Sequence, residues 1–161
     1  MDSKRNGFKS AGKRRSVPGS KRLAVKERSR VVIADDDAAI LDWIGSLLEL
    51  RFDVVGRAVN GRELVEAVGT LLPSVVVTDI TMPEMDGLEA CRLITSKYFG
   101  VKVVVISVHN DPVIIQAAFE AGASGYVWKF ALHYELIPAI ENVLAGRSYL
   151  SRGLPTSARE E

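Results

Sequence analysis

Apolar residues along the chain alternate between two spacings, and the alternation predicts strands and helices in turn. Short runs rich in valine and isoleucine are typical of buried strands, and they occupy 30–34, 53–59, 74–79, 101–107 and 125–129. After each run, apolar residues recur at helical spacing, over 38–50, 61–72, 87–98, 112–122 and 133–146. Five strands that alternate with five helices predict an α/β protein with a parallel sheet.

The third and fourth runs, 74–79 and 101–107, are almost continuously apolar. Parallel strands that are covered by helices on both faces have this pattern. We therefore predict a three-layer sandwich, with a doubly wound five-stranded parallel sheet between two layers of helices. In such a sheet, ligands bind just outside the carboxyl ends of the strands.

Polar residues stand at those carboxyl ends. The first strand is followed by three consecutive aspartates, 35–37, and the third strand ends in Asp79. The fourth strand ends in Ser107, and the fifth ends in Lys129. Because parallel strands end at the same edge of the sheet, we expect these side chains to lie close together.

This set of residues suits magnesium-dependent phosphoryl chemistry. Clustered carboxylates repel one another and need a cation at neutral pH, and Mg²⁺ binds carboxylate, carbonyl and phosphate oxygens. An aspartate can attack phosphorus and form an acyl phosphate. A lysine and a hydroxyl group then stabilise the charge on the phosphoryl oxygens.

Each of these residues alone has an ordinary explanation. Asp79 could simply begin a turn, and the aspartates of 35–37 could cap a helix. Ser107 could be an ordinary strand-end hydroxyl, and Lys129 could be a surface residue. Their occurrence together at one edge of one sheet favours the interpretation that they form a functional site.

The segments that carry these residues resemble the response-regulator receiver domain of two-component signalling. The resemblance extends from about Arg30 to Gly146 and rests on "VVIADDD", "VVVTDITMPEMDG", "VVVIS" and "GYVWK". It implies a flavodoxin-like fold with strand order 2-1-3-4-5. It also implies a signalling switch that catalyses its own phosphorylation and dephosphorylation, with a histidine kinase as partner.

The resemblance also assigns roles to single residues. Asp79 would be the phosphoacceptor, and Lys129 would pair with the phosphoryl group. Mg²⁺ would be held by Asp35, Asp36, Asp79 and the backbone carbonyl of Thr81. Ser107 would be the switch hydroxyl and Tyr126 the switch aromatic residue, which we expect to rotate inward after phosphorylation.

Two alternatives to a stand-alone receiver stay open. "ISVHND" and "VLAGRSYLS" resemble the NarL/FixJ (LuxR-type) branch, whose members normally carry a helix-turn-helix domain after the receiver. Only 15 residues follow Gly146, so the chain could be a truncated DNA-binding regulator. A magnesium-dependent phosphatase or phosphotransferase of the haloacid-dehalogenase type also uses a strand-end aspartate. That class normally has a second aspartate two residues later, where this chain has Thr81.

Charge divides the chain into an arm and a domain. Of the 21 basic residues, 11 lie within residues 1–30, where only two of the 20 acidic residues are found. We expect a basic, disordered arm over 1–29, a receiver domain over 30–147 and a short tail over 148–161. The arm could bind nucleic acid through phosphates, without reading sequence, or could be only a solvated tail.

The composition and the aromatic residues also predict where the protein is located and which surface contacts a partner. A single cysteine and the lack of an apolar stretch of ~20 residues predict a cytoplasmic protein without a membrane partner. Trp128, Phe130 and Tyr134 cluster around the fifth strand and fifth helix. We expect a phosphorylation-dependent homodimer, or another partner contact, across the fourth helix, fifth strand and fifth helix. The alternative is that these aromatic residues pack under the fifth helix.

Overall fold

The computed structural model describes residues 27–155. Residues 1–26 and 156–161 lie outside that part, so the expected disorder and nucleic-acid contact of the basic arm stay predictions. The strands are β1 (Arg30–Ala34), β2 (Asp53–Ala58), β3 (Val75–Asp79), β4 (Lys102–Ser107), β5 (Gly125–Trp128) and β6 (Tyr149–Leu150). The helices are α1 (Ala38–Leu48), α2 (Gly61–Leu71), α3 (Gly87–Lys97), α4 (Pro112–Glu120) and α5 (Leu132–Leu144), and a 3-10 turn covers Lys129–Ala131.

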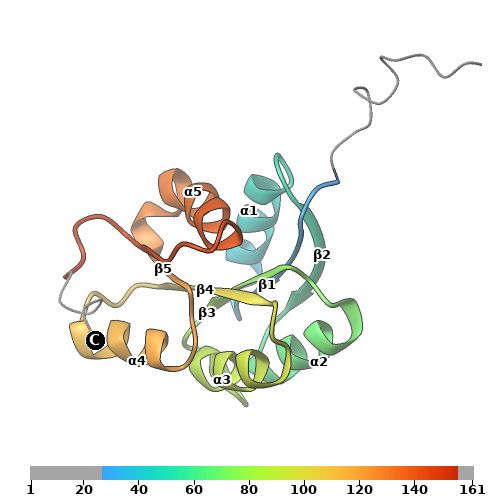
Figure 1. The fold of residues 1–161 in the computed structure, drawn as a ribbon, viewed down its shortest axis with the longest axis horizontal. Coiled ribbons are helices and arrows are strands. Elements are labelled where there is room, and N and C mark those ends of the chain that lie inside the picture. Colours follow the sequence, from blue (N-terminus) through green and yellow to red (C-terminus); the bar gives the residue numbers. More distant parts are fainter. Residues whose placement is uncertain (1–26, 156–161) are drawn as a thin grey trace, which may run out of the picture.

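The strands form one parallel sheet in the order β2-β1-β3-β4-β5-β6. Helices α1 and α5 cover one face of the sheet, and α2, α3 and α4 cover the other (Figure 1). The flavodoxin-like three-layer fold and the predicted order of the first five strands are confirmed. The predicted boundaries of the elements differ from the observed ones by at most two residues.

Side chains alternate along the strands and supply both apolar layers. In β1, Val32 faces the layer beneath α2, α3 and α4, whereas Val31 and Ile33 face the layer beneath α1 and α5. β3 and β4 contribute to both layers in the same way, which is why their sequences are apolar at nearly every position.

Four of the five α-helices begin with a side chain that caps the free backbone N–H groups of the first turn. Asp37, Asn60, Asp86 and Asp111 each accept a hydrogen bond from an amide two or three residues later. Asp37 and Asp86 also fix the turns that follow β1 and precede α3, which are the turns nearest to the predicted site.

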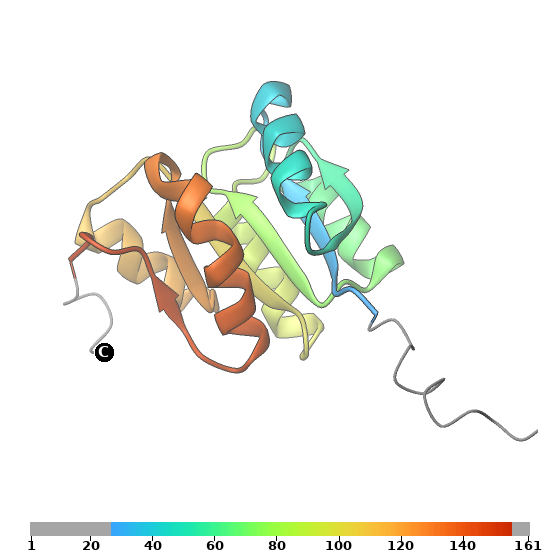
Figure 2. The ribbon, with the colours of Figure 1, turned by 90° about the horizontal axis from the view of Figure 1, so that it is seen from above.

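The sheet has a sixth strand that the sequence pattern did not predict. β6 lies beside β5 and runs parallel to it (Figure 2). Tyr149 is opposite Gly125, and Leu150 is opposite Tyr126. Leu150 and Leu154 are buried. Ordered structure therefore continues beyond residue 147, where a tail was expected to begin.

Across residues 27–155, no helix is both long enough and apolar enough to cross a membrane.

Candidate functional site

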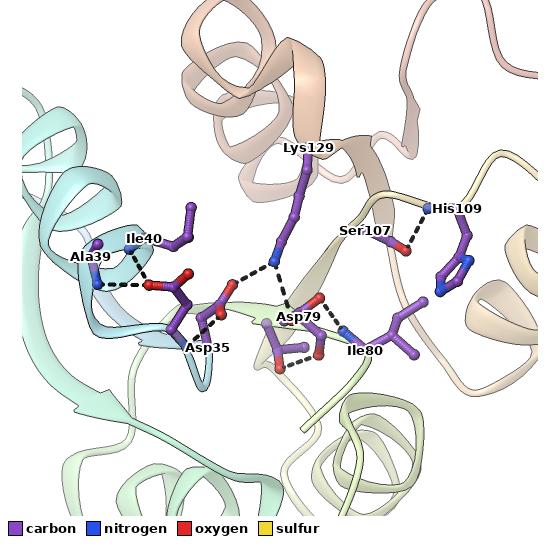
Figure 3. Close-up of polar contacts among 10 residues, drawn as sticks. Asp35, Ala39, Ile40, Asp79, Ile80, Ser107, His109 and Lys129 are labelled. Carbon is purple, nitrogen blue, oxygen red and sulfur yellow. Dashed lines mark hydrogen bonds and ion pairs between the residues drawn. The ribbon is translucent and has the colours of Figure 1, made fainter. Parts of the chain in front are cut away.

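Lys129 joins two carboxylates at the carboxyl edge of the sheet. Its Nζ lies 2.7 Å from Oδ2 of Asp35, at the end of β1, and 3.1 Å from Oδ2 of Asp79, at the end of β3 (Figure 3). Asp35 is fully buried and Asp79 is almost so. The structure thus brings together three of the predicted site residues, which are far apart in the sequence.

The three consecutive aspartates have different surroundings. Asp37 caps α1 by accepting hydrogen bonds from the amides of Ala39 and Ile40, so the ordinary explanation holds for this residue. Asp36 is exposed, and its carboxylate groups with those of Asp35 and Asp79, with one oxygen from each lying within 4.8 Å of the others. Such a set of oxygens around a partly open position fits Mg²⁺.

The charges at this edge influence one another. Burial raises the pKa of the Asp79 carboxyl above its usual value, and the nearby charge of Asp35 adds to the rise, while Lys129 opposes it. Burial alone would lower the pKa of the Lys129 ammonium, but its contacts with Asp35 and Asp79 raise it above its usual value. Lys129 therefore stays positively charged, while the buried Asp79 carboxylate is only partly compensated.

The loop after Asp79 folds back tightly onto the end of β3. The amide of Gly87 donates to the carbonyl of Ile80 at 2.8 Å, and a β-carbon at position 87 would overlap the carbonyl oxygen of Asp79. A glycine is therefore required where α3 begins. Thr81 lies in the exposed part of this loop, and the use of its carbonyl as a metal ligand stays a prediction.

Ser107 is buried at the end of β4 but is turned toward its own loop. Its hydroxyl accepts a hydrogen bond from the amide of His109 at 3.0 Å (Figure 3). Among the described residues, no hydrogen bond joins Ser107 to Asp79. A role of this hydroxyl toward a phosphoryl group would therefore require it to turn.

Tyr126 points inward from β5. It is fully buried, and its hydroxyl donates to the carbonyl of His109 at 2.8 Å. Burial raises the pKa of this phenol, although a hydrogen bond with Ser107 partly opposes the rise. The structure thus places Tyr126 inward, and its expected rotation on phosphorylation stays a prediction.

The aromatic residues after β5 are mostly exposed. Phe130 and Tyr134 are 73% and 80% exposed, so they do not pack under α5. Trp128 is half-buried. Its ring packs edge-on against that of Phe130, with the two ring centroids 5.0 Å apart. Its indole N–H donates to the carbonyl of Val108 at 3.2 Å.

A polar network that the sequence pattern did not predict lies beside β5. Glu135 of α5 accepts hydrogen bonds from the hydroxyls of Tyr149 and Ser151 and from the amide of Arg152, at 2.7, 2.9 and 3.0 Å. Ser151 is buried and also accepts a hydrogen bond from the amide of Trp128 at 2.9 Å. The only sequence signal is a glutamate on the helix before a short Tyr-Leu-Ser segment.

Comparison with known families confirms the class of protein that this fold and site define. Residues 31–141 match the family described as "Response regulator receiver domain". The chain belongs to this family, which serves two-component systems as a signalling switch and generally binds Mg²⁺ in an acidic pocket. The match decides for a receiver over an enzyme of the haloacid-dehalogenase type.

Similar proteins come from the LuxR-type branch. The transcriptional regulatory protein LnrK of Bacillus subtilis is 37% identical over 73% of this chain and 54% of its own length. The solved receiver domain of the putative response regulator NarL from Mycobacterium tuberculosis is 31% identical, with a TM-score of 0.73 over 76% of this chain and all of that one. RcsB dimers bound to DNA are 25% identical, with a TM-score of 0.72 over 78% of this chain and 65% of that one. The chain thus spans about half the length of its relative LnrK.

Proposed function

We propose that the chain is a phosphorylation-activated receiver that takes a phosphoryl group from a histidine kinase onto Asp79. A carboxylate oxygen of Asp79 attacks phosphorus, the bond between phosphorus and the kinase's histidine nitrogen breaks, and that nitrogen keeps the electron pair. The observation that carries this proposal is the contact of Lys129 with both Asp79 and Asp35. From this position the ammonium can form an ion pair with an oxygen of the phosphoryl group and stabilise its negative charge.

Asp35, Asp36 and Asp79 would hold Mg²⁺, together with the carbonyl of Thr81, as the grouping of the three carboxylates within 4.8 Å supports. When bound, the ion supplies positive charge that offsets the repulsion among the carboxylates and the incoming phosphoryl oxygens. Lys129 orients the acceptor, and the buried position of Asp79 limits the access of water.

The output is a changed protein contact across α4, β5 and α5, in which a second copy of this chain is the first partner to test. Ser107 and Lys129 are the donors at this edge that can respond to the phosphoryl group, which adds charge and acceptor oxygens. The exposed Phe130 and Tyr134 and the half-buried Trp128 support a contact surface there. The similar protein RcsB forms dimers in its complex with DNA.

Intact-protein mass spectrometry after incubation with phosphoramidate tests the chemistry. We expect one added phosphoryl group with Mg²⁺, none after chelation, and none on Asp79→Asn. Asp36→Asn should form less of the phosphoryl adduct than the wild type. Asp37→Asn is the matched control and should react like the wild type, because the side chain of Asp37 caps α1. A full phosphoryl adduct on Asp79→Asn would overturn the assignment of the acceptor.

A further inference from the structure

Residues 149–155, which we call the C-terminal segment, close the edge of the sheet at β5. The amide of Tyr149 donates to the carbonyl of Ser124, and the amide of Ser151 donates to the carbonyl of Tyr126, at 3.0 and 2.9 Å. Leu150 and Leu154 pack into the core layer that also contains Tyr126. The segment therefore occupies the sheet edge beside α5, within the face that we propose as a contact surface (Figure 2).

The segment is attached to α5 by hydrogen bonds to Glu135 and by the half-buried Tyr149, which packs against the apolar layer of α1 and α5. Glu135 accepts its three hydrogen bonds from residues of this segment, and hydrogen bonds to a charged acceptor are stronger than neutral ones. A cavity of about 400 Å³ lies between the segment and α5, lined by Tyr134, Glu135, Tyr149 and Arg152 among others. The strand itself is only two residues long. Release of so short a strand gives up the packing of Tyr149, Leu150 and Leu154 but leaves the pairing of the other five strands intact, so the domain need not unfold.

The segment also contacts the two residues of β5 that hold the loop after Ser107. Ser151 bonds to the backbone of both, accepting from the amide of Trp128 and donating its own amide to the carbonyl of Tyr126. The side chains of the same two residues donate to the loop, Trp128 to the carbonyl of Val108 and Tyr126 to that of His109. A continuous set of hydrogen bonds thus joins the loop of Ser107 to the C-terminal segment.

We propose that the C-terminal segment is an autoinhibitory cap, whose release from β5 is coupled to the phosphorylation of Asp79. Ser107 now accepts from the amide of His109, and turning the hydroxyl toward a phosphoryl oxygen breaks this bond and shifts the loop. The carbonyls of Val108 and His109 shift with it, which displaces Trp128 and Tyr126 from the positions that Ser151 requires. Release of the segment then uncovers the edge of β5 for a second copy of this chain, so the docked segment and that copy exclude each other.

This proposal rests on the proposed function. It is testable because docking of the segment and binding of a phosphoryl mimic must affect each other by the same factor. If phosphorylation weakens docking, then weaker docking must strengthen the binding of a phosphoryl mimic by the same factor. Beryllofluoride with Mg²⁺ is the probe, and amide hydrogen exchange of Ser151 and Trp128 in the full chain is the readout. We expect the mimic to accelerate exchange at these two amides by about fivefold or more, with amides in the centre of β3 unchanged.

Three variants separate coupling from a general loss of stability. Ser151→Ala and Glu135→Gln remove contacts of the segment, and each should bind beryllofluoride about fivefold more tightly than the wild type. Ser148→Ala is the matched control, since Ser148 is exposed and lies just before β6. It should bind the mimic like the wild type.

The outcomes distinguish the two proposals. If beryllofluoride shifts the NMR signals around Asp79 but leaves exchange at Ser151 and Trp128 unchanged, the coupling is wrong and the proposed function stands. Wild-type affinity in both Ser151→Ala and Glu135→Gln would also overturn the coupling. If beryllofluoride and phosphoramidate both leave Asp79 unchanged, the proposed function fails, and the coupling fails with it.

Discussion

Gly87 lies directly against the backbone carbonyl of Asp79, with no room for a β-carbon between them. The first residue of α3 and the last residue of β3 are therefore held at contact distance, and the loop between them has one tightly defined path. The position of the Asp79 carboxylate depends on this contact, because the backbone of Asp79 cannot move without moving α3.

Substitution Gly87→Ala should therefore affect both stability and chemistry. We expect a loss of about 1–3 kcal/mol in the free energy of unfolding, since the new methyl group must displace backbone. Phosphorylation by phosphoramidate should become slower. Gly100→Ala is the control, because a β-carbon there meets no atom within 4 Å. Urea unfolding and mass spectrometry measure the two effects, and equal behaviour of both variants would contradict the role of Gly87.

The incompletely compensated charge of Asp79 should be visible in thermal unfolding. Burial and the charge of Asp35 disfavour the Asp79 carboxylate, so Asp79→Asn should raise the Tm at neutral pH without Mg²⁺. Mg²⁺ should raise the Tm of the wild type by a few degrees and that of Asp79→Asn much less, since binding to the folded state stabilises it. Asp37→Asn should respond to Mg²⁺ like the wild type. An equal Mg²⁺ response in Asp79→Asn would speak against Asp79 as a ligand.

Glu135 should make the stability of the C-terminal segment depend on pH. Burial alone would raise the pKa of this carboxyl, but the hydrogen bonds from Tyr149, the Arg152 amide and Ser151, together with the charge of Arg152, lower it below its ordinary value of 4.5. The folded protein then binds the proton less tightly than the unfolded chain does. The stabilisation is therefore complete above that ordinary value and is lost as the pH falls through the lower pKa of the folded protein.

Urea unfolding of the wild type and Glu135→Gln over a range of pH measures this contribution. The wild type should be the more stable protein at neutral pH, and the difference should shrink in acid. A difference that stays constant from neutral to acidic pH would show that the charge of Glu135 does not contribute.

Cys91 should be unreactive in the folded protein. It is fully buried, and burial raises the pKa of its thiol to about 12, although Arg92 slightly opposes the rise. Because the thiolate is the reactive form, iodoacetamide should not modify the native protein at mildly alkaline pH and should modify it fully in urea. The chain has one cysteine, so the mass change is unambiguous. Rapid modification of the native protein would mean that α3 opens readily.

Most of the fold could be predicted because its signals are local. The spacing of apolar residues within ten or so positions distinguishes a strand from a helix, and it located five strands and five helices to within two residues. The positions of Asp35, Asp79 and Lys129 at strand ends followed from the same pattern, since parallel strands end at one edge. Their meeting at Nζ of Lys129 confirms that inference.

The sequence by itself thus determined the order of elements and the edge of the sheet at which Asp35, Asp36, Asp79 and Lys129 meet. Only the tertiary structure decided which aspartate caps α1 and which pairs with Lys129, because adjacent identical residues differ only in what surrounds them. It also decided the inward position of Tyr126 and the pairing of β6. A strand of two residues has no period to detect, and the bonds of Ser151 to Trp128 and Glu135 join residues 23 and 16 positions apart, which only the folded chain brings together.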